Sequence, residues 1–389
     1  MLEEKAERIL SLGYVCDRCL GRQFAELVPQ LDNAEKGGII RRFMLLEGHV
    51  RETEADVSNF GEKSHKKCCI CGGVFSRIKA MEKTVLNKIE NMDFRTFLVG
   101  VRTSDSLMMN EEKVFEKAGM KFSEPVKSEI KREITESIRE KTGKGVDNKE
   151  PDILLLFDLN EMKTEIFPKS LYICGEYRKL KRGIAQLNSP RFRKTVQGII
   201  EKPLLKKTLA KSSTLHALGR EKKEARCLAW RPFVIEINRP KKRKFSLKGV
   251  QKEINNNNGV KVRKLRRSEK KEVAELKSKS HYKTYRLLVV FEKDVKGPET
   301  LKRLEGKVKQ RTPGRLLGAI PEKTRNKKIK SIKWKRINNK KYQLEIKTES
   351  GLYIRELITG DSGRTKPSVS GLLGKKAELK EFDITEIEV

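Results

Sequence analysis

The stretch Leu215–Ile237, LHALGREKKEARCLAWRPFVIEI, joins a charged loop to a strand and decides how the second half of the chain is interpreted. Pro232 suits the first residue of a strand, because the N–H that it lacks is not needed there. Phe233, Ile235 and Ile237 then alternate with the residues between them at the period of a strand. A loop that ends on a rigid strand is a suitable place for a reactive group. The simpler interpretation is a charged surface loop before an ordinary strand.

The charge of the chain predicts a polyanionic partner. The 389 residues are enough for two or three domains with separate cores. Lysine and arginine total 88 against 53 aspartates and glutamates, which gives a net charge of +35. A field of this size attracts nucleic acid, and a membrane surface is the weaker alternative.

The beginning of the sequence and its cysteines indicate a cytoplasmic protein. MLEEKAERIL opens with acidic residues and has neither the basic nor the apolar region of a secretory signal. No apolar run approaches the roughly 20 residues that a membrane span needs. Seven cysteines, an odd number, argue against a disulfide framework. We therefore expect a reducing compartment and no membrane.

Two CxxC pairs near the N-terminus predict a metal site. Cys16 and Cys19 form the first pair, and Cys68 and Cys71 form the second, which is followed by two glycines. Two such turns bring four thiolates into the tetrahedron that Zn²⁺ prefers, with a structural role. A redox CxxC is the alternative, and His65 is a possible substitute ligand.

A basic and aromatic run follows in the middle of the chain. Ser170–Gln186, SLYICGEYRKLKRGIAQ, places two tyrosines among cations, and such a mixture grips phosphate and stacks on bases. Tyr172 is equally well explained as a core residue. The predicted phosphate contacts are Arg178, Lys179, Lys181 and Arg182. Residues 188–213 are interpreted as a basic linker or crossover helix.

Several of these segments, taken together, resemble one protein family. The segments are the two CxxC pairs, FLVGVR, the run Ser170–Gln186, LHALGRE, RPFVIEI, KTYR, QRTP and GLYIRELITGDSGRTKPSVSGLLG. In order and spacing they are similar to the archaeal and eukaryotic tRNA pseudouridine synthases of the Pus-ten type. The resemblance implies an α+β protein with a zinc-binding region (1–78), a THUMP-like RNA-binding domain (79–190) and a pseudouridine synthase catalytic domain (191–389). The catalytic domain is expected to contain a mixed, mostly antiparallel sheet.

The resemblance also implies the chemistry. The family isomerises uridines in the TΨC arm of tRNA, without an organic cofactor, by breaking the N-glycosidic bond and rejoining the base through C5. The base must first be flipped out of the RNA stack. Tyr285 matches the platform for that base, Arg355 the basic partner of the catalytic aspartate, and Leu357 the apolar residue under the base. The motifs add Arg220, Arg311 and Arg364 to the predicted RNA contacts, and no protein partner is implied.

One loop departs from the family pattern. The family reads Gly-Arg-Glu-Asp, whereas this chain reads Gly219-Arg220-Glu221-Lys222. Aligned from the left, the catalytic aspartate is replaced by Lys222; aligned from the right, the position falls on Glu221. A lysine provides no carboxylate and repels Arg355. A glutamate adds a methylene, and a misplacement of about 1 Å can cost on the order of a hundredfold in rate.

Three functions are therefore consistent with the sequence. The first is a tRNA pseudouridine synthase in which Glu221 or Glu224 replaces the aspartate. The second is a tRNA-binding homologue that has lost its chemistry. The third, a general basic RNA-binding protein with a zinc module, explains the charge but not the motifs.

Overall fold

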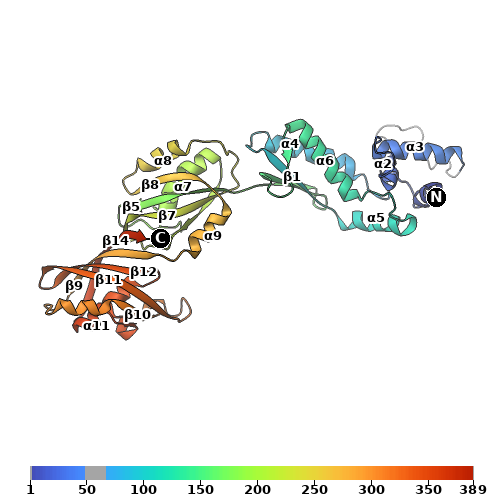
Figure 1. Ribbon diagram of the computed structural model, residues 1–389. Helices are drawn as coiled ribbons and strands as arrows, with labels where there is room; N and C mark the ends of the chain where they lie inside the picture. Colours follow the sequence, from blue (N-terminus) through green and yellow to red (C-terminus); the bar gives the residue numbers. More distant parts are fainter. Residues whose placement is uncertain (1, 49–66, 389) are drawn as a thin grey trace. The chain divides into compact units, whose positions relative to one another are not determined.

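The computed structural model describes residues 2–48 and 67–388 (Figure 1). The chain divides after Lys169 into two units, Met1–Lys169 and Ser170–Val389, and each has hydrophobic cores of its own. The predicted boundary at residue 190 differs from this division, because the strand Leu171–Lys179 belongs to the sheet of the second unit. None of the helices among the described residues is long and apolar enough to cross a membrane.

The first unit combines a small sheet with six α-helices and a short 3-10 helix among its described residues. Its four strands lie in the order β2-β1-β3-β4, with β1 parallel to β3 and β4 antiparallel to β3. The elements are α1 (Leu2–Leu10), α2 (Asp17–Gly21), η1 (Arg22–Phe24), α3 (Asn33–Leu46), α4 (Val74–Ile89), β1 (Thr96–Arg102), α5 (Asp105–Ala118), α6 (Val126–Thr142), β2 (Gly145–Val146), β3 (Ile153–Asp158) and β4 (Lys163–Pro168).

One continuous core fills the first unit. It contains Cys19 and Cys71 from the two CxxC pairs as well as Phe97 and Val99 of β1. Helix α6 buries Ile130, Ile134 and Ile138 in this core, a spacing of four residues that places all three side chains on one face of the helix. The residues predicted as a separate zinc-binding region therefore share a core with those predicted as the THUMP-like domain.

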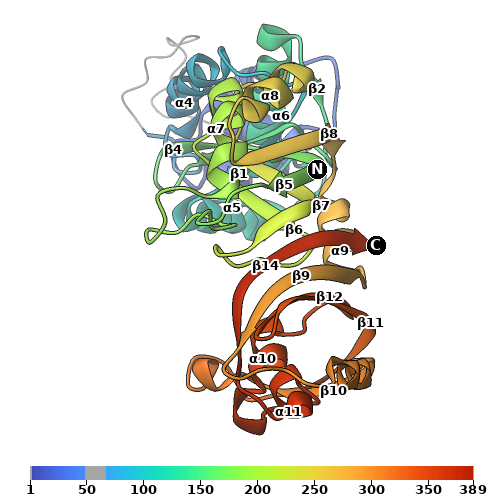
Figure 2. The ribbon, with the colours of Figure 1, turned by 90° about the vertical axis from the view of Figure 1, so that its left-hand side faces the viewer.

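The second unit is built on one ten-stranded sheet. Its strands lie in the order β13-β10-β11-β12-β9-β14-β7-β5-β8, with β6 paired to β7 (Figure 2). The elements are β5 (Leu171–Lys179), α7 (Val196–Thr208), β6 (Ser212–Ala217), β7 (Arg226–Asn238), α8 (Leu247–Asn255), β8 (Val260–Ser268), α9 (Lys270–Ser278), β9 (Tyr282–Phe291), η2 (Pro298–Leu304), β10 (Gly306–Arg311), η3 (Gly314–Leu316), β11 (Thr324–Asn338), β12 (Lys341–Glu349), α10 (Ile354–Thr359), η4 (Asp361–Gly363), β13 (Thr365–Lys366), α11 (Val369–Leu373) and β14 (Ala377–Glu388).

The faces of this sheet are covered differently. Helices α7 and α8 bury Ile200 and Val250 against β5 and β7, while α10 and α11 pack on β9 and its neighbours. Helix α9 packs Leu276 against Val234 on the opposite face of β7. The only parallel pair in the sheet joins β14 to β7. The predicted α+β class, with a mixed and mostly antiparallel sheet in the second unit, is confirmed.

Candidate functional site

The loop that the sequence singled out connects the hairpin strands β6 and β7. Gly219 begins it in the left-handed region, with φ of 74°, which glycine adopts without strain. Buried side chains then hold its backbone: Lys179 Nζ donates to the carbonyl of Lys222 at 2.8 Å, and Arg231 donates to that of Leu218 at 2.5 Å. The conformation of the loop is therefore fixed from inside the fold.

Glu221, the first candidate carboxylate, is buried beneath the loop. Its Oε2 lies 2.7 Å from Nε of Arg231, and neither side chain has any exposed surface. Tyr177 donates its hydroxyl hydrogen to the other oxygen, Oε1, at 2.8 Å, and Gln186 donates to Tyr177 at 2.9 Å. Both carboxylate oxygens are engaged within the protein. Glu221 is thus a structural counterion for Arg231 in this conformation.

Lys222, the other candidate position, is exposed on the loop. Burial lowers the pKa of its amine, and the positive charges of Arg315 and Arg355 lower it further, while Glu356 acts in the opposite direction. Arg315 is paired with the buried Glu356 through Nε and Oε1 at 2.7 Å. The charge of Lys222 is therefore close enough to Arg355, which is exposed on α10, for the two cations to repel each other.

Tyr285 and Leu357 belong to the same hydrophobic core. Tyr285 is buried on β9, opposite Ile346 of β12 and Ile384 of β14, and burial raises its pKa to about 12. Leu357 belongs to the same hydrophobic cluster, from α10, while Arg355 is exposed on that helix. Tyr285 and Leu357 thus share one core, the charges of Lys222 and Arg355 repel each other, and the buried Glu221 is close enough to Tyr285 for its charge to raise the pKa of that hydroxyl.

The four predicted metal ligands also come together. The Sγ atoms of Cys16, Cys19, Cys68 and Cys71 all lie within 4.8 Å of one another. Cys16 precedes α2, and the second pair lies in the turn before α4, where two glycines adopt positive φ. The backbone N–H of Cys16 donates to Sγ of Cys68 at 3.4 Å. This cluster can bind a metal ion; His65, the alternative ligand, lies outside the described residues.

Comparison with known proteins decides the family. The model "Pus10, C-terminal" matches residues 172–388, and "Pus10 THUMP domain, archaeal" matches residues 81–158. A protein of Pyrococcus furiosus named tRNA pseudouridine synthase Pus10 is 34% identical over all of this chain and 98% of its own length. The chain belongs to the Pus10 family. Another relative of the same name, from Methanothrix thermoacetophila, is 31% identical over 98% of this chain and 93% of its own length.

Among solved structures, this Pus10-family chain is similar to one titled "Crystal Structure of a Cbf5-Nop10-Gar1 Complex", at 17% identity and a TM-score of 0.32. That similarity covers 54% of this chain and 47% of the other. The family expected from the sequence motifs is confirmed by the models and the named relatives. The chain is a pseudouridine synthase-like protein with a THUMP domain.

The predicted RNA contacts of this Pus10-family chain differ in accessibility. Lys179 has no exposed surface and donates to the carbonyls of Ile184 and Lys222, so it cannot reach a phosphate in this conformation. Arg182 is paired with Glu381 and Asp383. Lys181 is exposed and so is Arg220. The alternation of a strand explains the difference, since it turns Lys179 inward with Tyr177.

Arg311 and Arg364 share one acidic partner. Arg311 lies 2.8 Å from Glu322, and Arg364 also pairs with that carboxylate. Nε of Arg364 donates to the carbonyl of Thr312 at 2.9 Å. Arg311 keeps 52% of its side chain exposed, whereas Arg364 keeps 19%. Arg311 is therefore the more accessible of the two for RNA.

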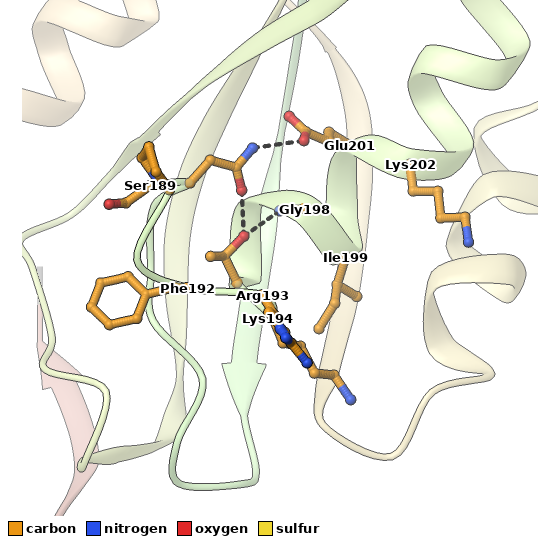
Figure 3. Close-up of a pocket in the computed structure, with 11 residues that line it drawn as sticks. Ser189, Phe192, Arg193, Lys194, Gly198, Ile199, Glu201 and Lys202 are labelled. Atoms are coloured by element: carbon orange, nitrogen blue, oxygen red, sulfur yellow. Dashed lines mark hydrogen bonds between the residues drawn. The ribbon is translucent and has the colours of Figure 1, made fainter.

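A basic pocket, missed by the sequence analysis, lies in the segment before α7. Its volume is about 650 Å³, and Figure 3 shows Phe192, Arg193 and Lys194 along it. In the part of the chain that the structure describes, Arg193, Lys194 and Lys202 form no ion pair. The acid Glu201 is occupied by neutral donors, with Asn188 Nδ2 at 2.7 Å and Ser213 Oγ at 2.5 Å. This leaves the pocket with free positive charge.

The pocket adjoins the Gly219–Ala225 loop. The ammonium of Lys223 lies over the ring of Phe192, 5.6 Å from its centroid. The charge of the segment 191–194, RFRK, was visible in the sequence, but only the fold brings it to the loop. The sequence predicts a basic linker or crossover helix over residues 188–213, and the structure has helix α7 there, but nothing in the local pattern indicates a cavity.

Proposed function

We propose that this chain binds tRNA through the TΨC arm and flips a uridine toward Tyr285, but isomerises it poorly or not at all. One observation carries this proposal: Glu221 is held in a buried ion pair with Arg231, and the next residue of the loop, which is exposed, is the cation Lys222. Tyr285, proposed as the platform for the base, and Arg355, proposed as the basic partner, are both present, but the catalytic aspartate is missing. A flipped base would then be held rather than converted.

The chemistry supports this proposal. Breaking the N-glycosidic bond in this family is attributed to a carboxylate that acts as nucleophile or base, kept ionised by a nearby cation. Lys222 carries the opposite charge and repels Arg355. Glu221 would have to leave a buried ion pair, and breaking such a pair costs about 3–5 kcal/mol because the remaining charge is left unpaired. Neither residue is therefore suited to the role in this conformation.

The positive charge supports RNA as the ligand. The net charge of the chain is +35. Three of its cations lie in the pocket before α7, beside the loop, without an ion-pair partner among the described residues. A volume of about 650 Å³ is within the range of ligand sites and suits a segment of ribose and phosphate. We therefore add Arg193, Lys194 and Lys202 to the proposed tRNA contacts, with Lys181, Arg220 and Arg311 as further candidates. We also propose that the protein acts in the cytoplasm, because its seven cysteines, an odd number, argue against a disulfide framework.

We propose that the four cysteines hold one Zn²⁺. With Zn–S bonds of about 2.3 Å, a tetrahedron has edges of about 3.8 Å. Sγ of Cys16 and Sγ of Cys71 are 3.8 Å apart, so the thiols fit such a site. Four protein ligands would leave no position for water, and a bound zinc would supply folding energy rather than catalysis.

A second candidate is a working synthase. The names of the relatives favour it, because proteins 31–34% identical over nearly the whole chain are called tRNA pseudouridine synthases. In that case Glu221 would have to move, or Glu224, which is exposed on the same loop, would supply the carboxylate.

Binding and product formation, measured on the same unmodified tRNA transcript, separate the candidates. We expect salt-sensitive binding and little or no pseudouridine from the wild-type chain. A triple variant, Arg193→Gln, Lys194→Gln and Lys202→Gln, should bind more weakly and show a shallower dependence of log affinity on log salt. Flat salt dependence would contradict the tRNA proposal, and efficient turnover would favour the second candidate.

A further inference from the structure

Neighbouring residues of β5 and β7 point to opposite faces of the sheet. Tyr177 and Arg231 are cross-strand partners, and both contact Glu221 on the face that carries the loop. Side chains alternate along a strand, so Arg178 and Trp230, the adjacent residues, lie on the other face. These two residues are therefore separated from the uridine site by the thickness of the sheet.

On that other face a tryptophan is enclosed by two arginines. The guanidinium carbon of Arg178 lies 4.4 Å from the ring of Trp230, and that of Arg263 lies 4.3 Å from the same ring. The three residues come from β5, β7 and β8, which are neighbours in the sheet (Figure 2). We call this group the arginine–tryptophan stack.

The stack is held in place and partly open to solvent. Nε of Arg178 is buried, and among the described residues it has no hydrogen-bond partner, so the indole is what fixes this group. Nε of Arg263 lies 2.5 Å from Glu176, and 41% of its side chain is exposed. Two planar cations that pack on one indole and are only partly buried form a preorganised surface.

The surroundings of the stack are basic. Lys264 shares Glu176 with Arg263, at 3.2 Å, and 68% of its side chain is exposed. Lys261 is the cross-strand partner of Arg178. Arg263 and Lys264 thus share one carboxylate, whereas Arg178 and Lys261 form no ion pair among the described residues, and the Lys261 amine donates to the carbonyl of Asn255. A polyanion complements this excess, and planar guanidinium groups stack on unpaired bases as well as binding phosphate.

We propose that the arginine–tryptophan stack is a second RNA-binding surface, on the sheet face opposite the uridine site, that takes unpaired nucleotides. This inference rests on the proposed tRNA function and extends its footprint to the other side of the sheet. Bases stack on the partly exposed guanidinium groups of Arg178 and Arg263, both of which pack on the indole. The neighbouring lysines neutralise the phosphates of the same RNA segment.

Fluorescence of Trp230 provides a direct test, because the chain has only two tryptophans. In the full chain with Trp334→Phe, titration with a ten-nucleotide oligouridylate or with unmodified tRNA should change the Trp230 emission. Arg178→Lys and Arg263→Lys retain the charge but remove the planar group. Each should weaken oligouridylate binding roughly tenfold, as expected for the loss of a stacked base.

Arg266→Lys is the matched control. Arg266 lies on β8 in a two-pronged pair with Glu272, at 2.9 and 2.6 Å, outside the stack. This variant should bind within about twofold of the parent, since replacing a paired surface cation has little effect. Thermal unfolding of all three lysine variants shows whether each retains the fold.

Different outcomes overturn different claims. If tRNA binds tightly but leaves Trp230 emission and the two lysine variants unchanged, the second surface is refuted and the proposed function stands. If no RNA binds at all, the proposed function fails as well. If polyglutamate changes the emission as strongly as RNA and is weakened equally by the variants, the surface belongs to an acidic protein and the proposal is wrong.

Discussion

Replacing Glu221 with glutamine tests whether this residue is a buried counterion or a catalytic carboxylate. The substitution keeps the shape of the side chain and removes the charge that faces Arg231 at 2.7 Å, where neither side chain is exposed. Arg231 would then be a buried and unpaired cation. Removing one partner of a buried pair costs about 3–5 kcal/mol. Each kcal/mol shifts the melting temperature of a domain of this size by about 2–4 °C, so we expect the second unit to melt roughly 10 °C lower.

Calorimetry of the full chain measures this effect, with Glu224→Gln as the control. Glu224 is exposed on the same loop, so its substitution should change stability by no more than about 0.5 kcal/mol. Replacing both members of the pair, Glu221→Leu with Arg231→Leu, should recover part of the loss, because no unpaired charge remains. The role of Glu221 as a buried counterion is refuted if the Glu221→Gln variant has the melting temperature of the wild type but no longer forms pseudouridine.

Three further predictions concern other parts of the chain. Burial lowers the pKa of Lys283 from its usual value of 10.5 to about 8. Between pH 8 and pH 10.5 the unfolded chain therefore binds more protons than the folded chain. The free energy of unfolding consequently rises with pH through that window. Urea unfolding should show Lys283→Met more stable than wild type at pH 7, by up to about 3 kcal/mol, with the difference shrinking toward pH 10; a constant difference would contradict the assignment. Cys71→Ser should remove the bound metal, measured by elemental analysis, and destabilise the first unit, whereas Cys69→Ser, an exposed thiol outside the cluster, should keep a full complement. Lys181→Gln should reduce the salt slope of tRNA binding by just under one unit, while the buried Lys179→Gln should lower stability; equal effects on binding from both would speak against the placement of Lys179.

Local patterns predicted the metal cluster and the strand after the loop. The spacing of Cys16 and Cys19 brings both thiols to one side of a turn, and the second pair repeats it, so four ligands could be expected from the sequence. Phe233 and Ile235 alternate with Val234, and the structure places them in opposite cores as the pattern requires. Both predictions depend only on residues that are close in the chain.

Long-range pairing determined what the sequence could not show. Lys179 and Arg178 carry the same charge and are adjacent, yet only the pairing of β5 with β7 and β8 shows that one is buried and the other stacked. Trp230 gave no local signal, because its partners come from two other strands. The same is true of Glu221, whose partner Arg231 lies on β7 and fixes which residue the loop presents.

Pseudouridine formed per bound tRNA, with protein in excess over an unmodified transcript, tests the central claim most directly. We predict that the wild type binds the tRNA and forms little or no product, and that Lys222→Asp forms more, since it returns a carboxylate to the position at which the family pattern has aspartate. Lys223→Asp, which makes the same charge change one residue away, should give no comparable gain. The opposite result would be one pseudouridine per tRNA from the wild-type chain and none from a Glu221→Gln variant that remains folded. That result would contradict the proposed loss of catalysis.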